Sequence, residues 1–149
     1  MSTAELSLFE ARQEISLFVE KTEKMFHMVP DLLKIKDENE FNKLFEHIEK
    51  YESISDSFEV EIANYLNQVS AGRLSPDSKT ALQSMMKEIS EIESIGDACF
   101  NMARVIRRKF QGEEDFTEEQ YSHIDQMIKL CNDALAHMVA VVEARTTII

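Results

Sequence analysis

The sequence is poor in the residues that turn a chain. Glycine and proline together number 5 among 149 residues, whereas an average usage of about 12% would give roughly 18. Because β-sandwiches and β-barrels need many tight turns, the composition excludes them. Hydrophobic residues make up 44% of the chain, which is normal for a folded protein and excludes wholesale disorder. The composition therefore favours a fold of a few long helices joined by a few loops.

Basic residues are also scarce. The chain has 16 Lys and Arg against 28 Asp and Glu, which gives a net charge of −12. Such a surface repels phosphate backbones and anionic lipid, so we expect no nucleic-acid binding. The most basic stretch contains Arg104, Arg107, Arg108 and Lys109, and this charge is typical of a helix C-terminus.

Cysteines are few, and long apolar runs are missing. Cys99 and Cys131 belong to no metal-binding or redox motif, so we expect buried free thiols in a reducing compartment. The first ten residues do not resemble a signal peptide. The longest apolar stretch, 134–142, is interrupted by His137 and is too short to cross a bilayer. These features predict a cytoplasmic chain that does not itself insert into a membrane.

Apolar residues at three-and-four spacing predict four helices, over about residues 3–35, 38–71, 76–111 and 118 onward. Short loops make successive helices antiparallel neighbours. The predicted fold class is therefore all-α, an antiparallel up-down helical bundle in one domain.

Residues with known capping preferences mark the helix ends. Pro30 should kink the first helix or end it early, and Gly72 is placed to stop the second. Ser75 has the N-cap position of the third helix, followed by proline at its first helical position. Thr117 and Gln120 form a capping box for the fourth, with Phe116 and Tyr121 as its hydrophobic staple.

One five-residue pattern occurs twice. Residues 52–56 read Glu-Ser-Ile-Ser-Asp, and residues 93–97 read Glu-Ser-Ile-Gly-Asp. In each copy the two carboxylates stand at i and i+4, on the same helix face and about one turn apart. The copies are equally distant from the turn at 72–75, so antiparallel helices place them at the same height, about 8–10 Å apart. We therefore expect four acids to converge on a common point: Glu52, Asp56, Glu93 and Asp97.

The two stretches of sequence that contain the copies lack basic residues. Residues 51–72 contain four acids and no Lys or Arg, and residues 88–103 do the same. Two like charges about 4 Å apart repel by about 1 kcal/mol in water and about 4 kcal/mol at an effective dielectric constant of 20. The carboxylates are therefore either partly protonated or bridged by a cation.

The four acids are the predicted metal ligands. Oxygen ligands favour hard ions such as Mg²⁺, Mn²⁺, Ca²⁺ or Fe over a thiolate-type zinc site, although the choice among Fe, Mn, Mg, Ca and Zn and the number of ions stay open. Glu49, Glu59 and Asn101 are candidate outer ligands.

Two other functions compete with metal binding. An acidic helical interaction module would dock a basic partner in the same groove without metal. A carboxylate-bridged di-metal enzyme is disfavoured, because no Glu is followed by His three residues later. A Gly-rich phosphate loop and a recognisable nucleophile are also missing, so we expect no enzymatic activity.

Around the repeated pattern, the sequence resembles the PhoU family. Residues 93–103 are similar to the family's third-helix consensus of an acid, then Ile-Gly-Asp, then Asn and Ala, and residues 52–62 resemble its second-helix counterpart. Ser94 and Ala98 depart from the consensus, because many relatives carry a basic residue and a histidine there.

The resemblance covers residues 3–112, one three-helix repeat, and leaves residues 113–149 as an additional helix of the single domain 1–149. Single repeats of this kind resemble the cytoplasmic C-terminal domain of bacterial Na⁺/phosphate cotransporters of the type II-related kind. The resemblance implies a non-catalytic regulatory role in phosphate uptake, with the four acids as metal ligands. Its implied partner is the membrane portion of a transporter or other transport machinery, and self-association is left open.

Overall fold

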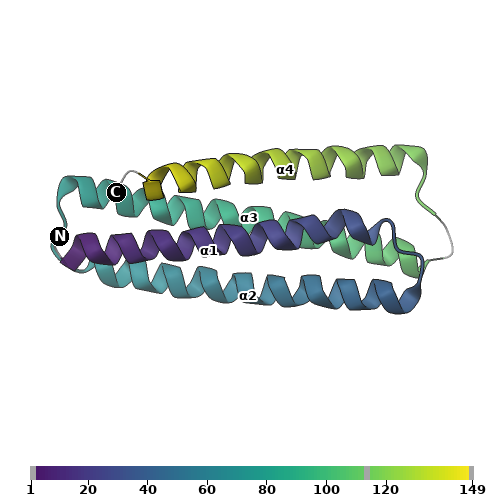
Figure 1. Ribbon diagram of the computed structural model, residues 1–149, viewed down its shortest axis with the longest axis horizontal. Helices are drawn as coiled ribbons and strands as arrows, with labels where there is room; N and C mark the ends of the chain where they lie inside the picture. The colour runs from purple at the N-terminus through teal and green to yellow at the C-terminus, as the bar shows by residue number, and fades with distance from the viewer. Residues whose placement is uncertain (1–2, 113–114, 148–149) are drawn as a thin grey trace.

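The computed structural model describes residues 3–112 and 115–147, and within these ranges the chain forms four α-helices and no strand. The helices lie side by side and alternate in direction (Figure 1). This arrangement confirms the predicted all-α up-down bundle. Residues 1–2, 113–114 and 148–149 of the predicted domain lie outside the described residues. The helices are α1 (Thr3–Leu32), α2 (Glu38–Ser70), α3 (Pro76–Gln111) and α4 (Glu118–Thr147).

Helix α1 ends at Leu32, earlier than the predicted boundary near residue 35. After Pro30, the backbone N–H groups of Leu33, Lys34 and Ile35 each donate to the carbonyl three residues back, at 3.2, 3.1 and 3.4 Å. This pattern is a tighter 3₁₀ turn. Pro30 itself lies inside the helix, which ends two residues after it.

Helix α2 ends at the position that Gly72 indicated in the sequence. This glycine, however, does not adopt a left-handed conformation. The C-cap residue Ala71 has ordinary helical angles, φ −73° and ψ −15°. The N–H of Gly72 donates to the carbonyl of Val69 at 3.1 Å, and no described glycine has a positive φ. The last turn therefore closes with short-range hydrogen bonds that do not require glycine.

The predicted helix starts are confirmed by their hydrogen bonds. Ser75 Oγ accepts from the N–H of Ser78 at 3.1 Å. Thr117 and Gln120 cap each other, since each backbone N–H donates to the other's side-chain oxygen, at 2.9 and 3.2 Å. The rings of Phe116 and Tyr121 meet edge to face at 5.1 Å, as expected for a hydrophobic staple.

The way the helices pack leaves one seam open. Helix α1 packs against the other three helices, and α2 packs against α3. Helix α4 packs on α1 and α3 and, among the described residues, does not touch α2. The α2–α3 seam is therefore covered by α1 on its inner side only. Among the described residues, no helix combines the length and the apolar character that crossing a membrane requires.

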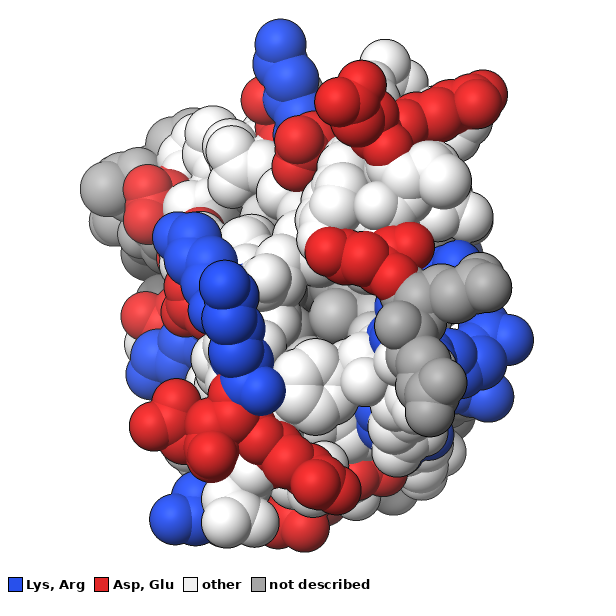
Figure 2. All heavy atoms as spheres, turned by 90° about the vertical axis from the view of Figure 1, so that its right-hand side faces the viewer, with Lys and Arg blue, Asp and Glu red and all other residues white. Residues whose placement is uncertain are grey.

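Two apolar clusters fill the bundle, one on each side of its middle. Along α1 the first cluster includes buried residues from Leu8 to Val19, and the second includes residues from Met25 to Leu32. Between them, α1 presents the buried Thr22, whose hydroxyl donates to the carbonyl of Phe18 at 3.0 Å. At the end where α1 meets α2 and α3 meets α4, charged side chains surround an uncharged centre (Figure 2).

Both cysteines are free thiols, as predicted. Cys99 on α3 is buried and Cys131 on α4 is half-buried, and the two thiols are hydrogen-bonded to each other. Burial raises the pKa of each thiol above its usual range, so neither is an activated nucleophile.

Candidate metal centre

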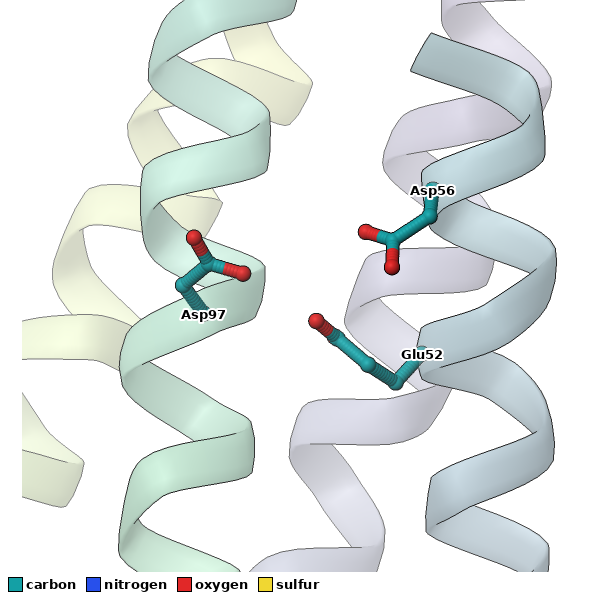
Figure 3. A group of neighbouring side chains, drawn as sticks. All are labelled: Glu52, Asp56 and Asp97. Carbon is teal, nitrogen blue, oxygen red and sulfur yellow. The ribbon is translucent and has the colours of Figure 1, made fainter. Parts of the chain in front are cut away.

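Three of the predicted acids meet across the open α2–α3 seam. Glu52 and Asp56 extend from α2 toward Asp97 on α3 (Figure 3). Each offers a carboxylate oxygen, and these oxygens lie within 4.8 Å of one another. The i, i+4 spacing puts Glu52 and Asp56 on one face of α2, and the antiparallel hairpin brings Asp97 to the same height.

A second group of acids overlaps the first. Carboxylate oxygens of Asp56, Glu59 and Glu93 also lie within 4.8 Å of one another. Asp56 belongs to both groups, so the two together form one cluster. We call Glu52, Asp56, Glu59, Glu93 and Asp97 the five-acid cluster. The structure therefore distributes the four predicted ligands over two adjoining groups and adds Glu59, which the sequence indicated only as an outer ligand.

The other two candidate outer ligands stand apart from these groups. Glu49 is exposed on α2, and no such group of His, Cys, Asp or Glu in the described part of the chain includes it. Asn101 is exposed on α3, one turn beyond Asp97. Their roles as ligands stay predictions.

Small residues lie behind the cluster, a feature that the sequence analysis did not use. Ser55 and Gly96 have the same position in the two copies of the repeated pattern, and both are buried. A Cβ atom on Gly96 would lie 3.6 Å from Met25 Cε and 3.9 Å from Glu52 Oε2. A Cβ atom at Gly96 would thus face α1 and the Glu52 carboxylate at ordinary contact distances. The matched small residue in both copies was the signal that could have revealed this layer.

The hydroxyl of Ser55 is part of this layer. Ser55 is 5% exposed, and its Oγ is buried without a hydrogen-bond partner. Buried hydroxyls in folded proteins are usually paired. A polar oxygen therefore remains unsatisfied on α2 beside the two acids that flank it in the sequence, Asp56 directly and Glu52 one turn earlier.

The pKa of Glu52 is raised to about 7. Burial makes the largest contribution because it disfavours the charged form. A hydrogen bond to Asp97 and the negative charges of Asp56, Asp97 and Glu93 add to it. Glu52 therefore keeps its proton to a higher pH than an ordinary glutamate does.

Glu93 and Glu59 are affected in the same direction. The pKa of Glu93 rises to about 7, first because its protonated form donates a hydrogen bond to Asp97, then because of burial and the charges of Asp97, Glu59 and Asp56. The pKa of Glu59 is raised by burial and by Asp56 and Asp97. Both protonated glutamates, Glu52 and Glu93, thus donate to Asp97. In the metal-free protein, these protons partly balance the negative charge of the cluster.

Among the described residues, the acids of the cluster have no paired protein cation. Within the described ranges, no Lys or Arg forms an ion pair with a member of the five-acid cluster. The cluster therefore has the first property of a cation site, a concentration of negative charge without a counter-charge.

The donor set fits a hard metal ion. Carboxylate oxygens bond Mg²⁺ or Ca²⁺ at roughly 2.0–2.6 Å, so opposite ligands of one ion stand roughly 4.0–5.2 Å apart. Oxygens that lie within 4.8 Å of one another can contact a common ion with only small side-chain adjustments. With carboxylates alone in both groups, hard divalent or trivalent ions are favoured over ions that prefer thiolate.

Comparison with known proteins places the chain in a family. A search of curated proteins and a search of solved structures found no match. The PhoU domain matches residues 15–106, which is more than half of the 149 residues. The match runs from within α1 to within α3 and contains the whole five-acid cluster, whereas α4 lies outside it. The chain belongs to the PhoU domain family.

Proposed function

We propose that this chain is a metal-binding regulatory domain of phosphate transport. Membership in the PhoU family indicates a helical regulatory domain connected with phosphate homeostasis, and domains of this family are generally non-catalytic. The finer proposal adds a metal ion at the five-acid cluster and a phosphate transporter as the partner.

The observation that carries the proposal is the convergence of five acids from two helices, none of which pairs with a Lys or Arg that the structure describes. Glu52, Asp56 and Asp97 would hold one ion, and Asp56 with Glu59 and Glu93 would hold a second or share the first. A bound ion supplies positive charge that replaces the protons on Glu52 and Glu93. Because these ligands come from both α2 and α3, an ion would also tie the two helices together.

Metal binding is tested by replacing one acid on each helix. In Asp56→Asn plus Asp97→Asn, both groups lose a carboxylate while the side-chain volume is kept. We expect the purified wild-type protein to retain one or two divalent or trivalent ions per chain after dialysis, measured by inductively coupled plasma mass spectrometry, and the double variant to retain far less. The matched control is Glu20→Gln plus Glu46→Gln, which removes two exposed acids outside the cluster. Unchanged metal content in the double variant would refute the metal site.

The proposed partner is the membrane portion of a Na⁺/phosphate cotransporter or related transport machinery, with this domain on its cytoplasmic face. Family membership supports a link to phosphate transport. We expect the gene to encode membrane spans ahead of this segment or to act with a transporter gene. In cells, Asp56→Asn plus Asp97→Asn should change regulation of phosphate uptake at equal protein level, as measured with radiolabelled phosphate. Uptake that responds to phosphate supply as in the wild type would contradict this role.

A basic protein partner is the second candidate, because Asp56 and Asp97 are exposed on the surface. An acidic seam that docks such a partner directly would bind it in excess chelator, and binding would weaken steeply as salt rises. If the transport partner binds in this manner and metal content is negligible, the cluster is an interaction surface. If chelation abolishes partner binding, the metal-binding proposal is supported.

A further inference from the structure

We propose that the end of the bundle where α1 connects to α2 and α3 to α4 binds a small amphipathic carboxylate. This end is remote from the five-acid cluster along the helices. A cavity of about 350 Å³ lies where the end of α1, the first turn of α2, the end of α3 and the start of α4 meet. Its volume is in the range of ligand pockets in proteins, roughly 300–1,000 Å³. Figure 2 looks onto this end, where uncharged side chains lie between basic groups on two sides and acidic groups above and below.

The walls of the cavity are mainly apolar. Phe41 and Phe110 stack with their ring centroids 4.0 Å apart, and the edge-to-face pair of Phe116 and Tyr121 lies beside them. Leu33 also lines the cavity. Leu33, Phe110, Phe116 and Tyr121 are only half-buried, so apolar surface at the end of the second core cluster still contacts solvent. A ligand with an aromatic ring or a short alkyl chain would cover it.

Two ammonium groups give the cavity its charge preference. Lys36 and Lys109 line it, and in the described part of the chain neither forms an ion pair with a carboxylate. Lys109 Nζ lies 5.7 Å from the centroid of the Phe116 ring. The lining carboxylate, Asp115, already accepts hydrogen bonds from the Tyr121 hydroxyl and the Phe116 N–H, both at 2.8 Å. Besides these hydrogen bonds, the charge of Lys36 also acts on Asp115 and lowers the pKa of that carboxyl. Two lysines against one carboxylate still leave the described lining positive, which favours an anion.

The apolar walls and the two lysines together indicate which class of ligand the cavity binds. A bare inorganic anion would gain little from walls of leucine and phenylalanine, and a neutral hydrocarbon would gain nothing from the lysines. A carboxylate with a body of about eight carbons uses both features. Each additional buried methylene should strengthen binding roughly fourfold until the cavity is filled.

The experiment uses the full chain in excess EDTA, so that the metal site plays no part. Hexanoate, octanoate and 1-octanol are titrated separately, and binding is followed by ¹H–¹⁵N NMR. We expect octanoate to shift the amide signals of Leu33, Gly112 and Phe116 and to bind roughly fifteenfold more tightly than hexanoate. Lys36→Gln plus Lys109→Gln should weaken octanoate binding about five- to tenfold and leave 1-octanol unaffected.

The matched control is Lys24→Gln plus Lys79→Gln, which removes the same charge from exposed lysines that do not line the cavity. Octanoate binding that both double variants weaken equally would overturn the assignment to this cavity. Octanoate shifts confined to other parts of the chain, or binding of 1-octanol as tight as that of octanoate, would overturn it as well. Lys24, Lys36 and Lys79 are exposed and Lys109 is half-buried, so circular dichroism of each double variant first verifies that the folded state is kept.

Discussion

The stability of the metal-free protein should fall as pH rises from 5 to 8. Glu52 and Glu93 have pKa values of about 7 in the folded chain, compared with 4.5 for an ordinary glutamate. The folded state therefore binds protons more tightly than the unfolded state. A group with a raised folded-state pKa contributes stability that is complete below pH 4.5 and is lost as pH rises through 7.

The expected size of this effect is modest because the groups are coupled and partly exposed. A change in pKa from 4.5 to about 7 corresponds to roughly 3 kcal/mol for one independent, shielded group. Water screens both glutamates, and both rely on Asp97, so their contributions do not add. We expect a total loss of about 1–2 kcal/mol between pH 5 and pH 8, or about 3–6 °C in the melting temperature of a chain of this size.

The assay is thermal unfolding followed by circular dichroism in excess chelator at constant ionic strength. Asp97→Asn should flatten the dependence on pH, because the amide removes the charge that both glutamates face. Glu46→Gln, an exposed substitution outside the cluster, should retain the slope of the wild type. A saturating divalent ion should reverse the trend, since metal binds the deprotonated carboxylates. Stability of the chelated wild type that stays flat or increases between pH 5 and pH 8 would refute the reasoning.

Three further substitutions test the packing and the helix ends by urea unfolding. Gly96→Ala should be neutral or stabilise the fold by up to about 1 kcal/mol, because alanine has the higher helix propensity and its Cβ would meet Met25 at an ordinary 3.6 Å. A loss of more than about 1 kcal/mol would show that the layer behind the cluster has no room for a methyl group. Ile92→Ala should cost about 2–5 kcal/mol, because Ile92 is fully buried, and a cost below about 1 kcal/mol would contradict its place in the core. Ser75→Ala should cost about 1 kcal/mol through loss of the N-cap bond to Ser78, whereas no measurable loss would mean that the cap is dispensable.

Local features of the chain were predicted well from the sequence. The capping box of Thr117 and Gln120 and the N-cap at Ser75 appear with the expected bonds, because these interactions form between residues three apart. The end of α1 was predicted only in part. Pro30 lies inside α1, and the chain leaves the helix two residues later through a 3₁₀ turn, a position that the proline alone does not fix.

The candidate site was half predictable. The common height of the two acid pairs follows from counting residues away from a turn, since an α-helix rises by a constant amount per residue. The division into two groups that share Asp56, with Glu59 in one of them, depends on how far α2 and α3 rotate about their own axes. Core packing sets this rotation, and the spacing of residues in the sequence does not reveal it.

The amino-acid sequence by itself determined the helical class, the approximate helix limits and the height at which the acids meet, because periodicity, capping and rise per residue are local properties. The tertiary structure decided what surrounds those acids. It placed Ser55 and Gly96 behind them, left the α2–α3 seam uncovered by α4, raised the pKa values of Glu52 and Glu93, and opened a cavity at the end of the bundle. These properties arise only when side chains from different helices share the same space and exclude the same water.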